Sequence, residues 1–189
     1  SDNGGGVKVS GPRWDAAGGV HRLPSPDGTT GTLLACAVDV VGPDPEVALD
    51  EFAVDTVVCL MERDDLDRRF PGYVRWLDGA IGGSRAVWAP APDHGVVPDV
   101  EAASLAADVR SRLERGTTVL LHCGAGYGRT GVLAVQVLAS GTGCPGGRDL
   151  EATLAAVRTA RPACGPQSDA QHEQLWRLCG DGIEGPSRE

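Results

Sequence analysis

The chain has 189 residues, which is enough for one sizeable α/β domain and short for two. Its formal net charge is −9 and Lys8 is its single lysine, so there is no basic face for DNA or RNA and we expect no nucleic-acid partner. The six cysteines show neither Cys-x-x-Cys pairs nor metal-ligand spacing, which favours reduced thiols and argues against a disulfide framework or a metal centre.

Short apolar runs alternate along the chain with amphipathic segments, and turn-forming residues separate them. In chain order, strands are predicted at Thr32–Ala35, Asp55–Leu60, Arg85–Trp88 and Thr117–Leu121. Helices are predicted over 43–51, Glu62–Arg69, Tyr73–Leu77, Pro98–Arg115, Val132–Ala139, Asp149–Ala160 and Ser168–Cys179, with a loop over 141–147. This alternation predicts an α/β fold, a single domain with a central, mostly parallel sheet that helices cover on both faces.

The predicted domain covers residues 13–180 and is flanked by short terminal segments. Residues 1–12 are rich in glycine and are expected to be flexible, as is a tail over 181–189. No apolar stretch is long enough to span a membrane and no secretory signal is visible, so we expect a cytoplasmic protein without a membrane partner. The abundance of Ala, Gly, Val, Pro and Arg is typical of a bacterial protein, and the sequence predicts no oligomeric state.

The most informative stretch is His122–Gly131, which reads HCGAGYGRTG and lies between a predicted buried strand and a predicted buried helix. Its glycines let the backbone curl, so that successive N–H groups face one concavity at the helix N-terminus, an arrangement suited to an anion. A cysteine in this place favours the thiolate, which is the nucleophilic form. The residues expected to form the anion site are Gly124, Ala125, Gly126, Tyr127, Gly128 and Arg129.

Three further side chains of this stretch suit chemistry on a phosphate. The planar fork of Arg129 holds two oxygens of a tetrahedral phosphate more specifically than an ammonium group would. Thr130 places a hydroxyl near the sulfur of Cys123, and His122 orients the loop through its ring N–H. A Walker A loop would need Gly-Lys-Ser/Thr, and a Rossmann loop needs neither Cys nor Arg. The remaining alternative is a buried cysteine with an arginine at this spacing by chance.

His-Cys, five residues and Arg-Thr-Gly, in a strand–loop–helix context, resemble the signature of the cysteine-dependent protein tyrosine phosphatase superfamily, in the version used by dual-specificity enzymes. With the features described below, the resemblance covers about residues 30–180. It implies a phosphomonoester hydrolase in which Cys123 attacks the substrate and forms a phosphocysteine, while Arg129 and the loop N–H groups stabilise the phosphate oxygens. It implies neither a metal nor an organic cofactor.

The leaving oxygen of a phosphomonoester needs a proton, so a general acid is expected on a separate loop. Pro90-Ala91-Pro92-Asp93 resembles the acid-bearing loop of the family, in members with Pro-x-Pro-Asp in place of Trp-Pro-Asp. By that match Asp93 is the general acid, and in the second step the base that takes a proton from water. The alternatives are an aspartate in a Pro-rich surface turn, and His94 as a rival acid, because imidazole titrates nearer neutrality.

Breakdown of the phosphocysteine requires an oriented water. Residues 161–171 resemble the glutamine loop of the family, in which Gln167 and Gln171 have the spacing of the tyrosine-specific branch. An amide can donate to a phosphate oxygen while it accepts from water, so Gln167 is predicted to place the hydrolytic water. For Gln171 a second interpretation stays open, because Ser168-x-x-Gln171 is also a capping box that opens the last helix.

Cys59 ends the strand predicted to neighbour the signature strand. In some family members a cysteine near this place forms a reversible disulfide with the nucleophile, which protects it from irreversible oxidation. Cys59 is therefore a candidate redox partner of Cys123. The alternative is a small buried residue at a strand end.

The partner implied by the resemblance is a phosphorylated substrate, and its class stays open between a phosphoprotein and a small metabolite such as a sugar or nucleotide phosphate. Phosphoinositide-directed relatives tend to carry lysines in the signature loop, where this chain has Gly124 and Tyr127. Other possibilities are a non-catalytic phosphate-binding module, sulfur transfer and arsenate reduction. Arginines that could line the rim of the site are Arg63, Arg68, Arg69 and Arg75.

Overall fold

The computed structural model describes residues 8–139 and 147–180. In this part of the chain, strands form a five-stranded sheet in the order β1-β2-β5-β3-β4. The bounds are His21–Leu23 (β1), Thr32–Ala37 (β2), Thr56–Cys59 (β3), Ala86–Trp88 (β4) and Thr118–Cys123 (β5). Residues 1–7 of the expected N-terminal segment, the predicted loop up to residue 146 and the tail over 181–189 lie outside the described residues.

The register brings the carboxyl ends of four strands to one edge of the sheet. β2, β5, β3 and β4 are mutually parallel, whereas β1, the outermost strand beside β2, runs antiparallel to it. The last residue of β5, Cys123, pairs with Ala37 of β2, and His122 pairs with Cys59 of β3. Sites of open parallel sheets form at this edge, where the connections to the helices start.

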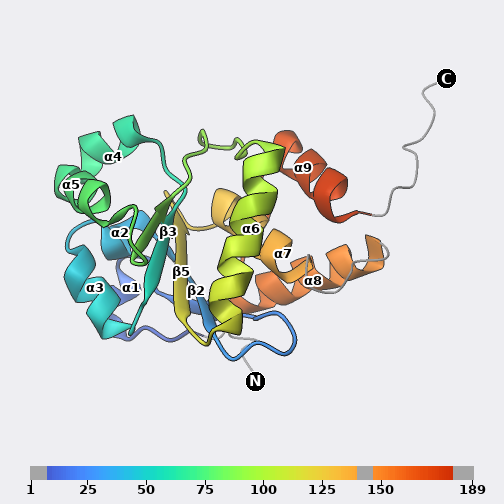
Figure 1. Cartoon of the computed structure of the whole chain (residues 1–189), viewed down its shortest axis with the longest axis horizontal. Coiled ribbons are helices and arrows are strands. Elements are labelled where there is room, and N and C mark those ends of the chain that lie inside the picture. Colours follow the sequence, from blue (N-terminus) through green and yellow to red (C-terminus); the bar gives the residue numbers. More distant parts are fainter. Residues whose placement is uncertain (1–7, 140–146, 181–189) are drawn as a thin grey trace.

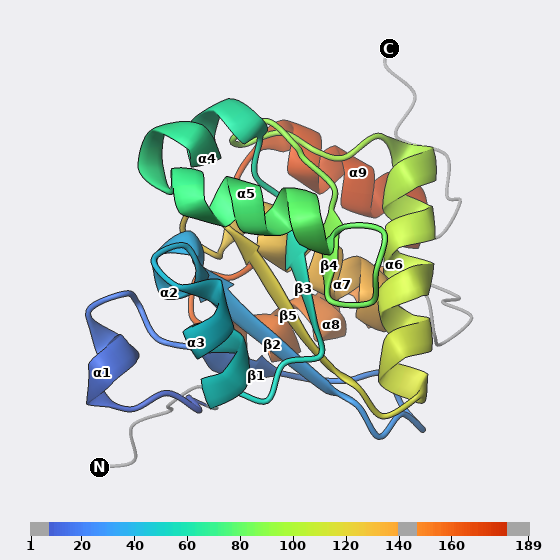
Figure 2. The ribbon, with the colours of Figure 1, turned by 60° about the vertical axis from the view of Figure 1, so that its left-hand side comes forward.

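Helices cover both faces of the sheet, as the alternation of elements predicts. The described helices are Pro12–Asp15 (α1), Val38–Val41 (α2), Pro45–Glu51 (α3), Arg63–Arg69 (α4), Pro71–Ala80 (α5), Asp99–Glu114 (α6), Gly128–Ala139 (α7), Gly147–Ala160 (α8) and Asp169–Cys179 (α9). Figure 1 shows α3, α4 and α5 on one side of the sheet and α6, α7, α8 and α9 on the other, and Figure 2 shows α5 crossing the near face. The expected fold class is confirmed.

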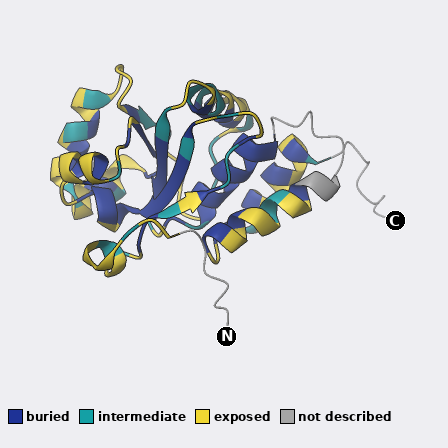
Figure 3. Ribbon diagram, turned by 90° about the horizontal axis from the view of Figure 1, so that it is seen from below, coloured by how far each residue is buried: buried dark blue, intermediate teal, exposed yellow. Residues whose placement is uncertain are grey.

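Every residue of α7 is buried, although it follows the glycine-rich motif directly. The helix packs between β5 and the three helices α6, α8 and α9. A helix that is apolar on all sides belongs in the interior, and Val132–Ala139 contains only one polar side chain, Gln136. Figure 3 shows the central strands and α7 as the buried interior, whereas the outer helices have exposed faces.

Three short elements were not predicted, and several boundaries differ. β1 spans three residues and contains polar His21 and Arg22, too few for a period-two pattern, and it forms because it pairs with β2. α1 and α2 have four residues each, which is shorter than a recognisable helical period. α5 is longer than the predicted Tyr73–Leu77, since Pro71 fits the first helical turn. α7 starts at Gly128, inside the signature motif, because packing overrides the low helix propensity of glycine.

No helix in the described ranges is long and apolar enough to cross a bilayer. The same residues hold no group of three His, Cys, Asp or Glu side chains that could bind a metal ion.

Candidate active site

The loop between β5 and α7 requires glycine for steric reasons. Gly126 has a φ of +76°, in the left-handed region that side chains other than glycine rarely adopt. A Cβ atom at this position would also overlap the carbonyl group of Cys36 on the neighbouring strand. In the first turn of α7, a Cβ atom on Gly131 would overlap the backbone of Gly165, so α7 packs directly on the segment 161–171.

The carbonyl oxygens of loop residues 124–127 all accept hydrogen bonds from groups outside the loop. The first accepts from the N–H of Val38 at 3.0 Å, and the last from the N–H of Gly165, also at 3.0 Å. The two between accept from the side chain of Arg161. Within the described chain, the N–H groups of residues 124–129 have no protein acceptor. With its carbonyls turned outward, the loop has the form of an anion-binding nest.

Arg161 is a structural element of this site that the sequence did not reveal. Its buried guanidinium donates from Nε to Gly126 O at 2.8 Å and from Nη2 to Ala125 O at 3.1 Å, and it lies over the ring of Tyr127. Nη1 donates to Nδ1 of His21 on β1 at 2.6 Å. Burial and the neighbouring Arg161 lower the pKa of His21, and this keeps its Nδ1 an acceptor.

His122 lies beneath the loop in a fully buried position. Its Nδ1 is 3.2 Å from the carbonyl of Cys123, and its Nε2 is 2.7 Å from the hydroxyl of Tyr73 on α5. A carbonyl can only accept, so Nδ1 carries the proton and Nε2 accepts from Tyr73. Burial lowers the pKa of His122 to about 4, with the nearby Arg129 acting in the same direction. The ring is therefore neutral at pH 7, and it links the end of β5 to α5.

Cys123 and Thr130 lie on either side of the loop, both buried. Cys123 is the last residue of β5 and a free thiol. The hydroxyl of Thr130 has no hydrogen-bond partner in the described part of the chain. Because buried hydroxyl groups are normally paired, the hydroxyl of Thr130 is available to donate a hydrogen bond to a group that the protein itself does not supply.

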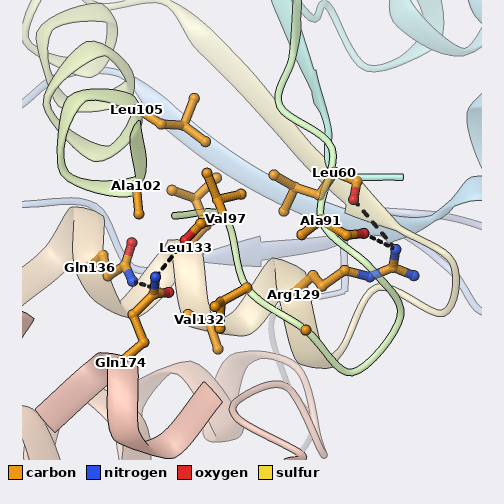
Figure 4. A pocket seen from close by; sticks show the side chains of 12 residues that line it. Leu60, Ala91, Val97, Ala102, Leu105, Arg129, Val132, Leu133, Gln136 and Gln174 are labelled. Atoms are coloured by element: carbon orange, nitrogen blue, oxygen red, sulfur yellow. Dashed lines mark hydrogen bonds between the residues drawn. The ribbon is translucent and has the colours of Figure 1, made fainter. Parts of the chain in front are cut away.

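Arg129 connects the loop to two segments distant in the sequence. Its Nη1 donates to Ala91 O at 3.0 Å and to Leu60 O at 3.4 Å, as Figure 4 shows, and Nη2 lies 3.3 Å from Oδ1 of Asp93. Nη2 is also the atom nearest to a Cβ placed on Gly124, at 3.4 Å. The guanidinium is thus positioned between the nest formed by residues 124–129 and the predicted acid.

Asp93 remains open to solvent although it contacts Arg129. Its side chain is 67% exposed, against 6% for Arg129, so its carboxyl is accessible from solvent. The N–H of His94 donates to Oδ1 of Asp93 at 3.1 Å, and the His94 ring lies 3.8 Å from Oδ2. His94 adopts a φ of +58°, so the chain turns sharply immediately after the carboxylate.

The two glutamines of the predicted pair occupy different surroundings. Gln167 is exposed and lines the same hollow as Asp93, and its Oε1 is next to Gly128 at the start of α7. Gln171 is buried: its Oε1 accepts from the N–H of Gln167 at 2.8 Å, and its Nε2 donates to Gly95 O at 3.1 Å. The N–H of Gln171 donates to Ser168 Oγ, which is the capping interpretation. Gln171 therefore orders two loops and does not face the hollow.

Cys59 lies on the strand next to Cys123, but one position away in register. Paired residues of parallel strands lie on the same face of the sheet. Cys59 pairs with His122 and therefore lies on the face opposite to that of Cys123. Burial raises the pKa of the Cys59 thiol to about 12. This register does not favour a Cys59–Cys123 disulfide. The role of Cys59 as a redox partner therefore stays an untested prediction from the sequence.

The open hollow above the loop has a mixed rim. The residues that line it are Asp39, Met61, Asp65, Arg69, Asp93, His94, Gly124, Ala125, Arg129 and Gln167. Of the four arginines considered for the rim, Arg69 alone is in this set, and its Nη2 lies 3.2 Å from Asp39. Arg63 instead pairs with Asp78, and Arg68 with Asp65.

The cysteine at the end of a central parallel strand, the nest of N–H groups and the arginine that faces an aspartate on a separate loop agree with a phosphatase domain of the protein tyrosine phosphatase type, and the family comparison shows this type. The chain belongs to the family described as PTP-SAK, the DSP-PTPase phosphatase domain of Swiss Army Knife proteins, whose model matches residues 44–174. No curated protein matches the sequence.

Solved structures of this type resemble the chain over most of its length. The active form of Tk-PTP is 26% identical, with a TM-score of 0.58 over 80% of this chain and 92% of that one. Kinase associated phosphatase, with its catalytic cysteine replaced by serine, is 20% identical, with a TM-score of 0.68 over 82% and 90%. Human DUSP28 is 18% identical, with a TM-score of 0.56 over 77% and 90%.

Proposed function

We propose that the protein hydrolyses phosphomonoesters through a covalent phosphocysteine on Cys123. The thiolate attacks phosphorus and the bond to the leaving oxygen breaks, while Arg129 and the N–H groups of residues 124–129 bind the equatorial oxygens. Asp93 gives its proton to the leaving oxygen. In the second step Gln167 orients a water, Asp93 takes a proton from it, and the hydroxyl of Thr130 donates to the departing thiolate.

The observation that carries this proposal is the 3.3 Å contact between Arg129 and Asp93. It brings the candidate acid, from the connection after β4, to the anion-binding nest after β5, thirty-six residues further along the chain. A phosphate in the nest would lie beside the arginine, with its ester oxygen directed toward the open hollow where Asp93 is exposed. The unpartnered hydroxyl of Thr130 supports the same assignment.

The test is hydrolysis of p-nitrophenyl phosphate by the wild type and by Cys123→Ser. We expect steady turnover by the wild type and none by C123S, with a phosphorylated Cys123 trapped by acid quench during wild-type turnover. Binding of phosphate by C123S without hydrolysis would agree with the proposal. Turnover by C123S at the wild-type rate would refute the cysteine mechanism. Phosphate binding by a wild type that shows no turnover would identify the protein as a phosphate-binding module instead of an enzyme.

Within this proposal, the rim supports a substrate with few negative charges besides the scissile phosphate. Asp39 and Asp65 line the hollow and are paired with Arg69 and Arg68, so neither of these arginines is free to bind a further phosphate. A phosphoprotein segment or a singly phosphorylated metabolite satisfies this condition. One structure with the same fold, PTPMT1, was solved in complex with PI(5)P. A panel of phosphopeptides, sugar phosphates, nucleotides and phosphoinositides, ranked by kcat/KM, decides between these classes.

A further inference from the structure

We propose that Gln174 of α9 is a positioning residue for the general acid. By binding the loop that carries Asp93, it holds the carboxyl of Asp93 near the anion-binding nest. This inference rests on the proposed function. Gln174 touches neither the nest nor the hollow, and no sequence motif pointed to it. It acts on the acid loop, defined here as residues 89–98 between β4 and α6.

Three side chains hold the acid loop, one from the N-cap residue of α9 and two from the helix itself. Ser168 Oγ donates to His94 O at 2.6 Å, and Gln171 Nε2 donates to Gly95 O at 3.1 Å. Gln174 Nε2 donates to Val97 O at 2.5 Å. The donors follow each other at intervals of three residues, the spacing of neighbours on a helix surface, and their acceptors follow each other along the loop.

The amide of Gln174 is fixed in orientation from its other end. Its Oε1 accepts from Nε2 of Gln136 on α7 at 3.0 Å, so its NH2 group must face the loop. That NH2 group also donates to Oδ1 of Asp99, at the start of α6. Arg177 and Gln174 lower the pKa of Asp99 to about 2 and keep it an acceptor. Gln174 thus ties three helices to the end of the acid loop.

Packing alone does not hold the loop in place. A small, mostly apolar cavity lies between the acid loop and the helices behind it, and its walls include Ala91, Val97, Leu105 and Leu133. Figure 4 shows Gln136 and Gln174 at one end of this cavity and Arg129 at the other. Because the packing behind the loop leaves this gap, the hydrogen bonds from α9 contribute to the position of the loop. In such apolar surroundings a lost amide donor leaves the Val97 carbonyl unpaired.

The test compares substrates that differ in their need for an acid. Gln174→Met keeps the approximate size of the side chain but removes both donors. Phenoxide needs a proton more than p-nitrophenoxide does, so displacement of Asp93 affects phenyl phosphate most. We expect kcat/KM for phenyl phosphate to fall roughly ten- to hundredfold and that for p-nitrophenyl phosphate to fall by no more than about twofold, since a positioned acid contributes about 10²–10⁴. Glu173→Gln, on the exposed side of α9, is the matched control.

A double-mutant cycle separates positioning from general destabilisation. In an Asp93→Asn background the acid is absent, so Gln174→Met should cause no further loss with phenyl phosphate. An equal loss with both substrates, or an additive loss in the D93N background, would overturn the inference. If Q174M does not fold, Gln174→Glu gives the same test, because it keeps the bond from Gln136 and directs a carboxylate oxygen at the Val97 carbonyl. Wild-type turnover that depends on Cys123 keeps the proposed function intact even where this inference fails.

Discussion

At the scale of single residues, the geometry around Asp93 and His94 favours Asp93 as the side chain that supplies the proton. Asp93 contacts Arg129, whereas the His94 ring lies on the far side of the carboxylate, 3.8 Å from Oδ2. We therefore expect Asp93→Asn to lower kcat for phenyl phosphate by roughly 10²–10⁴-fold, the contribution of a general acid. His94→Asn is the matched variant, since asparagine tolerates the φ of +58° at this position. Turnover that survives D93N but is lost in H94N would assign the acid to the histidine.

The contacts of Arg161 give a second prediction at this scale, which concerns phosphate binding. It holds the carbonyls of Ala125 and Gly126 outward, and lysine cannot reproduce this fork. Arg161→Lys leaves at least one of these two carbonyls without its donor, which costs about 1–3 kcal/mol where it is that of buried Gly126, and loosens the nest. We expect weaker phosphate binding and an equal fall of kcat/KM for phenyl and p-nitrophenyl phosphate, because the acid is untouched. Phosphate titration followed by tryptophan fluorescence measures the first effect. Unchanged phosphate affinity in R161K would show that the loop keeps its shape without the arginine.

At the scale of elements, α7 and the glutamine loop approach each other so closely that only glycine fits. A Cβ atom on Gly131 would overlap backbone atoms of Gly165, which cannot rotate away as a side chain would. Gly131→Ala is therefore expected to lower the free energy of unfolding by about 1–3 kcal/mol, the range for an overpacked interior. Gly79→Ala in α5 is the control, because its Cβ meets nothing within 4 Å and alanine favours the helix. Urea unfolding measures both, and equal stability of G131A and the wild type would contradict this packing.

At the scale of the whole molecule, local signals predicted the parallel sheet, its two helical layers and the phosphate loop. The motif at 122–131 needs only its own residues to be recognised, because glycines, cysteine and arginine share one loop. Arg161 and Gln174 were not predicted, since each acts on a loop 35 or more residues away in sequence. In the sequence Arg161 marks a helix end and Gln174 is one polar residue in an amphipathic helix. Contacts of such separation become visible only when the elements are assembled.

The molecule as a whole is expected to lose stability in mild acid, through the buried imidazole of His122 and the half-buried imidazole of His21. The pKa of His122 is about 4 in the folded chain, against an ordinary value of 6.5, and that of His21 is also lowered. The unfolded chain therefore binds these protons first, so the stability is complete above pH 6.5 and falls between pH 6.5 and about 4. The shift of His122 corresponds to roughly 3 kcal/mol.

The lowered pKa of Glu46 affects the stability in a more acidic pH range. The pKa of Glu46 is held at about 2, chiefly by its hydrogen bond from Arg85, so its contribution is lost only as the pH falls below its ordinary value of 4.5. Urea unfolding between pH 7.5 and 4.5 consequently reports mainly on the histidines, and NMR titration of the imidazole protons assigns the effect to His122. A free energy of unfolding that stays constant across this range would show that His122 takes up its proton without leaving its site beneath the phosphate loop.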